Sequence, residues 1–458
     1  MKHFFKTQVL ACLATLGLVP AAVSAAPFTP GNVVVVRIGD GSAALTSAAT
    51  ATFLLEYTPA GVLVQTLALP TAAAGTNSIL TNTGSSTSDA VLTRSANGAY
   101  LILTGYDAAV GTAAITTTAA ATNNRIIGRV AANGTIDTST RIGDAFSGTS
   151  ANGANIRSAA SVDGTAFYAV GSNTGVRYVP FGTAAATATT ALTTAAPTNN
   201  RSVGVHGGNL YVASASGANF GISQVGTGVP TTASQTITQL PGFPTATGPS
   251  PYAFYFADLS TAVAGVDVVY IADDRATADG GIQKWSLVGG TWTLNGTIGS
   301  TATPAVALRG VNGRTTGTTV SLVASGNGGL YFLSDNTGYN VAPSTAALPA
   351  PIATAAANTA FRGVAFAPVA TATAVAPNHA MPGLSISPNP ASDRISIFLP
   401  KAGAATVALR ELTGRVVLAP AALAADNQLR LPAGLAAGVY LLEVSQGTVT
   451  AVRRVVKN

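Results

Sequence analysis

Short apolar runs alternate with turn residues along most of the chain. The runs are rich in β-branched and aromatic residues, as in Val33–Ile38 and Tyr252–Phe256, and Gly, Pro, Asn and Ser separate them. Runs of this length and composition predict strands, because a helix needs a longer stretch with a period of 3.6 residues. We therefore expect an all-β protein.

One pattern recurs between residues 28 and 369. An arginine and a small residue lead into an apolar run, and a second run rich in Tyr and Val follows. The arginines are Arg94, Arg157, Arg201, Arg309 and Arg362, and a related unit at Tyr252–Phe256 lacks one. The units repeat at roughly 45–65 residues, which is typical of four-stranded β-propeller blades that cover one another's faces.

The ends of this region support a closed ring. The unit at Arg362 has one strand, and Val33–Ile38 with the two apolar runs after it would complete its sheet. We expect residues 28–369 to form a β-propeller of six blades. Seven blades are the alternative, because 171–200 and 224–250 are rich in Ala, Thr and Gly and could hide strands. A stacked β-sandwich or a β-helix is the other interpretation.

The chain begins with a segment typical of a secretory signal peptide. Met1–Lys6 is basic, Val9–Val23 is apolar, and small residues up to Ala25 suit cleavage, so residues 1–25 are predicted to be removed. The one cysteine, Cys12, lies in this segment. The mature chain is then expected to have no disulfide and no transmembrane segment.

The texture changes near the C-terminus. Residues 370–383 are rich in Ala, Thr and Pro without periodicity, which predicts a linker. From 384 to 458, apolar and polar positions alternate in several short runs. This pattern predicts a small antiparallel β-sandwich of the immunoglobulin-like kind.

Four motifs in residues 384–458 occur in a fixed order. They are Ser387–Ala391, Leu412–Val417, Leu435–Leu442 and the terminal Arg454–Lys457. This region resembles the C-terminal sorting domain of the type IX secretion system of Gram-negative bacteria. The residues that carry the resemblance are Pro388, Asn389, Pro390, Gly414, Gly438, Tyr440 and Lys457.

The resemblance implies a route out of the cell. The signal peptide would bring the chain to the periplasm, and the type IX machinery would export it. A sortase-like peptidase would then cut in the linker, and the rest would be joined to anionic lipopolysaccharide or released. We expect a secreted or surface-attached protein. Gly414 and Gly438 are expected in turns that need a positive φ.

The net charge of +6 does not describe the working domain. Residues 26–383 hold 12 Arg and 1 Lys against 12 Asp and 1 Glu, so the excess lies at the two ends of the chain. No basic stripe with interleaved aromatic residues occurs there, and we expect no nucleic-acid partner.

We find no catalytic constellation. The mature chain has two histidines, His206 and His379, and His206 in its Gly-rich surroundings is expected to be a polar turn residue. Nucleophile-elbow, phosphate-loop and zinc-protease motifs do not occur. Glu56 is the one glutamate in 28–369, so a glycosidase-like carboxylate pair would need aspartates. We predict no catalytic residues and no cofactor.

An aspartate cluster is a candidate metal site. Asp273, Asp274 and Asp279 lie on a loop with glycines that follows an apolar run. Carboxylates on such a loop suit Ca²⁺, although Arg275 lies among them. The alternative is a turn held by hydrogen bonds from backbone N–H groups to the aspartates.

The repeated arginines are the second candidate. If Arg94, Arg157, Arg201, Arg309 and Arg362 hold the same position in their blades, they meet near one mouth of the central channel. There they would bind an anionic ligand such as an acidic glycan. The alternative is a structural role in which each bonds carbonyls of a neighbouring blade.

These observations favour a non-enzymatic binding or adhesion protein. The alternative function is a secreted hydrolase or lyase acting on glycans through Asp and Arg at the channel mouth. A purely structural envelope component is the third class. Fold alone does not choose among them.

Overall fold

The computed structural model describes residues 26–149, 153–277, 279–299, 306–326, 328–370, 381, 383–411, 415–447 and 449–458. The chain divides into two compact units, Met1–Ala370 and Thr371–Asn458. The predicted signal peptide with Cys12, His379 and the rest of 371–380, and Gly414 lie outside the described residues. Within the described ranges, no helix is long and apolar enough to cross a membrane.

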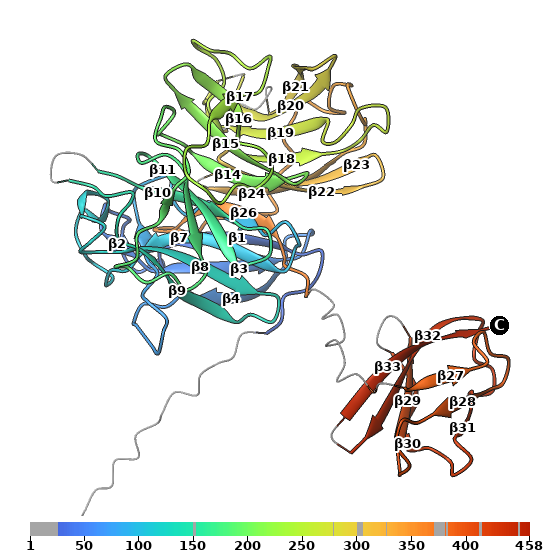
Figure 1. Ribbon diagram of the computed structural model, residues 1–458. Helices are drawn as coiled ribbons and strands as arrows, with labels where there is room; N and C mark the ends of the chain where they lie inside the picture. The colour runs from blue at the N-terminus through green and yellow to red at the C-terminus, as the bar shows by residue number, and fades with distance from the viewer. Residues whose placement is uncertain are drawn as a thin grey trace, which may run out of the picture. The chain divides into compact units, whose positions relative to one another are not determined.

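Strands make up nearly all the regular structure, as predicted. The one helical element among the described residues is the 3₁₀ turn η1 (Ile115–Thr117). Unit 1 contains, in its described part, six antiparallel sheets of four strands each and a small pair, β2 (Ala49–Thr50) with β5 (Asn82–Thr83). Figure 1 shows these strands in the blue to orange part of the ribbon.

Five of the six sheets are each built from four consecutive strands. They are β6 (Thr93–Arg94), β7 (Tyr100–Tyr106), β8 (Arg125–Ala131) and β9 (Ile136–Ile142); β10 (Ile156–Ala160), β11 (Ala166–Gly171), β12 (Arg177–Pro180) and β13 (Thr190–Ala191); β14 (Ser202–His206), β15 (Asn209–Ser216), β16 (Asn219–Val225) and β17 (Ile237–Gln239); β18 (Pro251–Ala257), β19 (Val268–Asp273), β20 (Gly281–Val288) and β21 (Thr291–Ile298); and β22 (Gly310–Thr316), β23 (Thr319–Ser325), β24 (Gly329–Asp335) and β25 (Ala353–Thr354).

The sixth sheet joins the two ends of unit 1. Its order is β26 (Ala360–Phe366), β1 (Val33–Ile38), β3 (Thr52–Tyr57) and β4 (Leu63–Ala68). The last strand of the unit, β26, pairs antiparallel with the first, β1, and Val34 lies opposite Ala365. The sequence predicted this pairing from the incomplete unit at Arg362.

The first strands of the six sheets contact one another in a closed series. β6 contacts β10, β10 contacts β14, β14 contacts β18, β18 contacts β22, β22 contacts β26, and β26 contacts β6. Single backbone hydrogen bonds join neighbours, such as Val91 N–H to Arg157 O (3.0 Å) and Ala253 N–H to Arg309 O (3.1 Å). The first strands therefore surround a common axis.

Packing between sheets explains why the strands are apolar on both faces. Successive side chains of a strand point to opposite faces. In β19, Tyr270 packs in one core cluster with Leu322 of the following sheet, and Val269 packs in another with Tyr211 of the preceding sheet. All six residues of β19 are buried.

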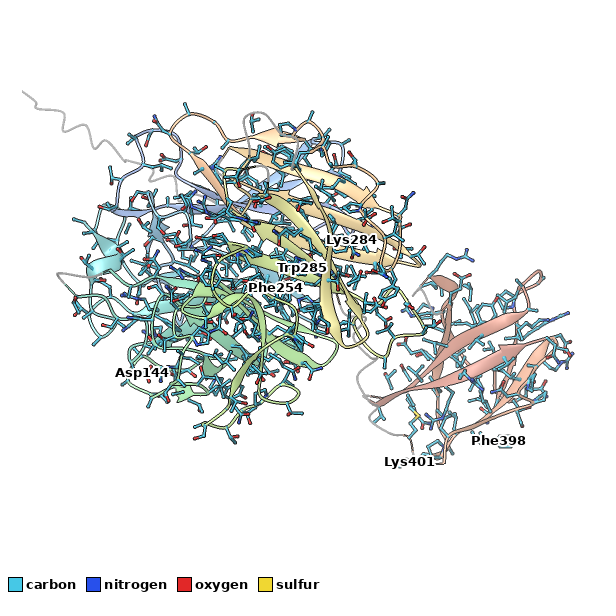
Figure 2. All side chains as sticks on the ribbon, turned by 90° about the horizontal axis from the view of Figure 1, so that it is seen from above. Asp144, Phe254, Lys284, Trp285, Phe398 and Lys401 are labelled. Carbon is cyan, nitrogen blue, oxygen red and sulfur yellow. The ribbon has the colours of Figure 1, made fainter. Side chains whose placement is uncertain are left out.

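A buried ion pair links the sheet that begins with β18 to the sheet that begins with β22. Lys284 Nζ lies 2.7 Å from an Asp335 carboxylate oxygen, and Tyr270 Oη donates to the same carboxylate at 2.7 Å. Lys284 also donates to Thr337 Oγ1 (2.7 Å) and to Gly338 O (2.8 Å) (Figure 2). Every polar group of this inter-sheet contact is thereby partnered, which a buried charge requires.

Unit 2 consists of two sheets around one apolar core. One contains β27 (Ser385–Ser387), β28 (Arg394–Phe398) and β31 (Gln428–Arg430); the other contains β30 (Val416–Ala422), β29 (Thr406–Glu411), β32 (Gly438–Gln446) and β33 (Val449–Lys457). Ile395 and Ile397 of the first sheet pack in the same cluster as Leu409 and Leu442 of the second.

The motif residues of unit 2 stabilise its ends. The Asn389 amide donates to Arg454 O and accepts from Val456 N–H, both at 2.7 Å, which holds the Pro-rich segment on β33. Tyr440 Oη donates to Ala436 O at 2.8 Å. Gly438 begins β32 opposite Lys457 and has no positive φ, so the turn predicted there is wrong.

Candidate functional site

Hydrogen bonds between first strands fix which residues lie at the same level. Val91 N–H bonds to Arg157 O, Ala253 N–H to Arg309 O, and Gly363 N–H to Ala90 O. Each acceptor directly precedes the residue that corresponds to the next donor. This register places Arg157, Arg201, Arg309 and Arg362 together at the start of the first strands, with Tyr252 and Ala90 in the two remaining sheets.

Arg94 does not belong to this level. It ends β6, four positions beyond Ala90, and each strand residue adds about 3.3 Å. The assumption that all five arginines hold one position is therefore wrong for Arg94. We call the group of Arg157, Arg201, Arg309 and Arg362 with Tyr252 the closed end.

At the closed end, one carboxylate serves two arginines. Asp274 accepts from Arg309 Nε (3.2 Å), and its other oxygen lies 3.5 Å from an Arg201 Nη atom. The Tyr252 ring lies 4.4 Å from the Arg201 guanidinium and 5.5 Å from that of Arg309. Ser250 Oγ completes the Arg201 contacts at 2.6 Å. Their charge is thus largely compensated within the protein.

The other two arginines of the closed end bond mainly to neutral oxygens. Arg157 donates to Asn199 Oδ1 (2.6 Å) and to Asn200 O (3.2 Å). Arg362 donates to Gly84 O (3.1 Å), and its Nε lies 3.9 Å from Asp89. Burial lowers the pKa of both arginines. These contacts are those expected of structural arginines.

Asp89 is a buried carboxyl group beside Arg362. It accepts from Thr83 N–H at 3.2 Å, and no other side chain among the described residues donates a hydrogen bond to it within 3.5 Å. Burial raises the pKa of Asp89 to about 7, although the Arg362 charge favours the ionised form. Asp89 therefore changes its protonation state near neutral pH.

Little space remains at the closed end. The void lined by Asp89, Tyr252, Arg309 and Arg362 has a volume of about 10 Å³. Such a volume holds a single water molecule. No organic ligand fits there.

The predicted calcium ligands contact arginines. Asp273 is buried and accepts from Arg275 Nε (2.9 Å) and from another Arg275 nitrogen (2.9 Å). Asp274 belongs to the closed end, and Asp279 lies 3.4 Å from Arg275. Among the described residues, no three His, Cys, Asp or Glu side chains gather as a metal site.

The opposite ends of the first strands surround a larger cavity of about 440 Å³, which we call the open pocket. Arg94 ends β6, His206 ends β14, Tyr255 lies late in β18, and Asn312 and Arg314 lie on β22. The residues that line it are Arg94, Ser95, Ala96, Asn97, Gly98, Val205, His206, Gly207, Tyr255, Phe256, Asn312, Gly313, Arg314 and Thr315.

The charge of the open pocket is uncompensated. Arg94 is part-buried and donates through Nε to Gly98 O at 3.0 Å, and Arg314 is exposed and lies 5.3 Å from the Phe366 ring. Neither arginine has an ion-pair partner in the described part of the chain, and no described Asp or Glu lines the cavity. Burial lowers the pKa of Arg94, and the nearby charge of Arg314 lowers it further.

Aromatic rings form part of the wall. The His206 ring packs against Phe254, Tyr255 and Phe256 at centroid distances of 5.5 to 5.8 Å. Burial lowers the pKa of His206 to about 4, so the imidazole is neutral at pH 7. Tyr255 lies against Gly313, where an added Cβ would come within 2.1 Å of the ring. The prediction of a polar turn histidine missed this environment.

The open pocket narrows inward. A second void of about 40 Å³ continues along the channel, and Arg94, Val205, His206 and Asn312 line both. These residues form the neck between the two spaces. The sequence offered one usable signal for this site, since Asn312 and Arg314 place polar side chains at alternate positions of a strand next to the axis.

Residues 385–458 match the family described as "Secretion system C-terminal sorting domain". Unit 2 carries a type IX secretion sorting domain. The sequence-based prediction is confirmed, and the sorting domain makes this a secreted or cell-surface-attached protein. The match says nothing about unit 1.

No curated protein matches the chain. Among solved structures, it is similar to the extracellular domain of a one-component system from B. thetaiotaomicron, with 11% identity and a TM-score of 0.35 over 95% of this chain and 59% of that one. It is also similar to proteins described as 6-phosphogluconolactonases from Bacteroides uniformis (11% identity, TM-score 0.35, 93% and 100% coverage) and Bacteroides fragilis (10%, 0.35, 87% and 95%). TM-scores this low establish neither a shared fold nor an activity.

Proposed function

We propose that this exported protein is a six-bladed β-propeller that binds an anionic ligand in the open pocket without turning it over. Six four-stranded sheets whose first strands contact in a closed series support the blade count. In the same proposal, residues 1–25 are a signal peptide, 28–369 the propeller, 370–383 the linker cut by a sortase-like peptidase, and 384–458 an immunoglobulin-like sorting sandwich.

The observation that carries the binding proposal is the unpaired charge of Arg94 and Arg314. Two guanidinium groups at one cavity, without a described carboxylate partner, attract an anion. Guanidinium groups form charge-assisted, often bidentate hydrogen bonds with carboxylate and sulfate groups. The closed end lacks this property, because its arginines already bond Asp274, Asn199 and backbone carbonyls.

The same geometry favours binding over hydrolysis. A glycan hydrolase needs a pair of carboxyl groups beside the scissile bond. Asp89 and Asp274 lie at the closed end, away from the open pocket. His206, with its pKa lowered to about 4, is a poor general base near pH 7.

The test is titration calorimetry of the purified full chain with acidic and neutral polysaccharides. We expect binding of the acidic ones, weakened about 10- to 100-fold by Arg94→Ala or Arg314→Ala, since each removes a charge-assisted hydrogen-bond donor. Arg129→Ala is the matched control, because Arg129 is a part-buried arginine of unit 1 that pairs with Asp137. Unchanged binding in both pocket variants, or release of cleaved product, would overturn the proposal.

A further inference from the structure

We infer that the open pocket receives the terminal acidic sugar of a glycan chain, with its carboxylate on Arg94, and does not accommodate an internal segment at that depth. This inference rests on the proposed function. It follows from the shape of the space around the axis and from the position of Arg94 within that space.

The space around the axis has one usable entrance. At the open pocket the cavity holds about 440 Å³, which is within the range of small-ligand sites. Beyond the neck it shrinks to about 40 Å³, and at the closed end to about 10 Å³. The inner spaces hold water molecules only. A glycan chain therefore cannot pass through the ring.

Arg94 lies at the neck, at the deep end of the open pocket. It lines both the outer cavity and the inner void, whereas Arg314 lines only the outer cavity. A sugar whose carboxylate reaches Arg94 must insert that residue inward from the mouth. An internal sugar is bonded to neighbours on both sides, so its two chain ends would have to leave through the same entrance.

The free donors of Arg94 suit a carboxylate. Its Nε is engaged by Gly98 O, and its two Nη atoms make no hydrogen bond to a described residue. A planar fork held at one nitrogen is pre-organised for a bidentate contact with a planar carboxylate. Arg314 at the rim adds attraction for the same charge.

The walls suit a sugar ring. Tyr255 and His206 present uncharged aromatic surfaces, and the Tyr255 hydroxyl is fixed by Thr315 Oγ1 at 3.0 Å. Asn97 and Asn312 contribute amide groups to the same cavity. Apolar faces with a few placed polar groups are the usual composition of a small-ligand site.

The experiment compares two trisaccharides with the full chain by titration calorimetry. One carries a uronic acid at its non-reducing end, and the other carries the same uronic acid in the middle, between neutral sugars. We expect the terminal form to bind at least about tenfold more tightly, the cost of losing one charge-assisted bidentate contact. Free glucuronic acid should compete, and its methyl ester should not.

Variants separate the neck from the rim. Arg94→Lys keeps the charge but not the fork, so it should abolish the preference for the terminal form. Arg314→Ala should weaken both trisaccharides by a similar factor and keep the preference. Arg129→Ala should change neither.

Each further outcome has one meaning. Equal affinity for the two trisaccharides, with both still sensitive to Arg94→Lys, overturns the terminal-sugar inference and leaves the proposed binding function intact. Binding of neither trisaccharide, nor of any acidic polysaccharide, overturns the proposed function itself.

Discussion

The two ends of the ring of first strands use the same residue type in opposite ways. At the closed end, Arg201 and Arg309 share Asp274, and Arg362 lies beside Asp89. In the open pocket, Arg94 and Arg314 face a cavity without a described acidic partner. An arginine near a propeller axis is therefore structural or available for binding according to what lies within about 4 Å of its guanidinium group.

The comparison also shows how the protein separates stability from binding. Charges that stabilise the ring are buried and partnered, and their removal should damage the fold. Charges that are exposed at a cavity contribute little to the fold, and their removal should affect ligands. Four measurements address this difference.

The largest effect is expected for Arg362→Ala. It leaves the Asp89 carboxylate buried without its cation, and breaking a buried pair in this way costs about 3–5 kcal/mol at pH 8. Guanidinium denaturation measures the loss. Arg314→Ala is the control from the open pocket and should change the free energy of unfolding by less than about 0.5 kcal/mol. Similar losses in the two variants would contradict the comparison.

The next effect is a pH dependence that Asp89 introduces. Because burial raises its pKa to about 7, the folded protein retains a proton that the unfolded chain releases above pH 4. The free energy of unfolding should therefore fall as pH rises from 4 to 7, by up to about 1.4 kcal/mol per pH unit.

Asp89→Asn provides the comparison for this pH series, because the amide keeps the size and does not titrate. Denaturation of both proteins at several pH values should give a flatter profile for the variant over this range. A wild-type profile parallel to that of Asp89→Asn would show that Asp89 is not the titrating group.

A smaller effect is expected for Gly313→Ala. The new Cβ would lie 2.1 Å from the Tyr255 ring, so the ring must move. Overpacking of this kind costs about 1–3 kcal/mol, and a displaced Tyr255 should also lower the affinity of an acidic ligand. Gly317→Ala on the neighbouring turn changes φ strain but not the pocket, and it should leave the affinity unchanged. Equal affinities for wild type and Gly313→Ala would argue against a role for Tyr255.

The smallest effect is expected from His206. Its pKa of about 4 should rise when an anion occupies the open pocket, because the anion stabilises the imidazolium form. Affinity should then increase about threefold between pH 7 and pH 5, and His206→Gln should remove this increase. A calorimetric pH series on both proteins measures it, and a dependence that persists in His206→Gln would assign it to another group.

Much of the architecture is readable from local sequence. The period of short apolar runs predicted the strands, and the single strand at Arg362 predicted the pairing of β26 with β1. The motif residues from Pro388 to Lys457 predicted the sorting domain, because a short domain with ordered motifs carries its identity in its sequence.

The candidate site was only half visible. Arg94 was grouped with the other four arginines because Arg94-Ser95 looks like Arg157-Ser158 and Arg201-Ser202. The structure separates them, and it adds His206, Tyr255, Asn312 and Arg314, which no local motif marked. Which of these residues share a cavity depends on segments that are far apart in the sequence.

The sequence by itself determined that the chain folds into strands, where its sheets begin and end, and that it is exported. Tertiary structure decided which arginines are neutralised and which remain available. The physical reason is register, since the bonds Val91 N–H to Arg157 O and Gly363 N–H to Ala90 O set how each first strand lies along its neighbours. A shift of four residues moves an arginine from one end of the ring to the other, and a local sequence pattern carries no information about that shift.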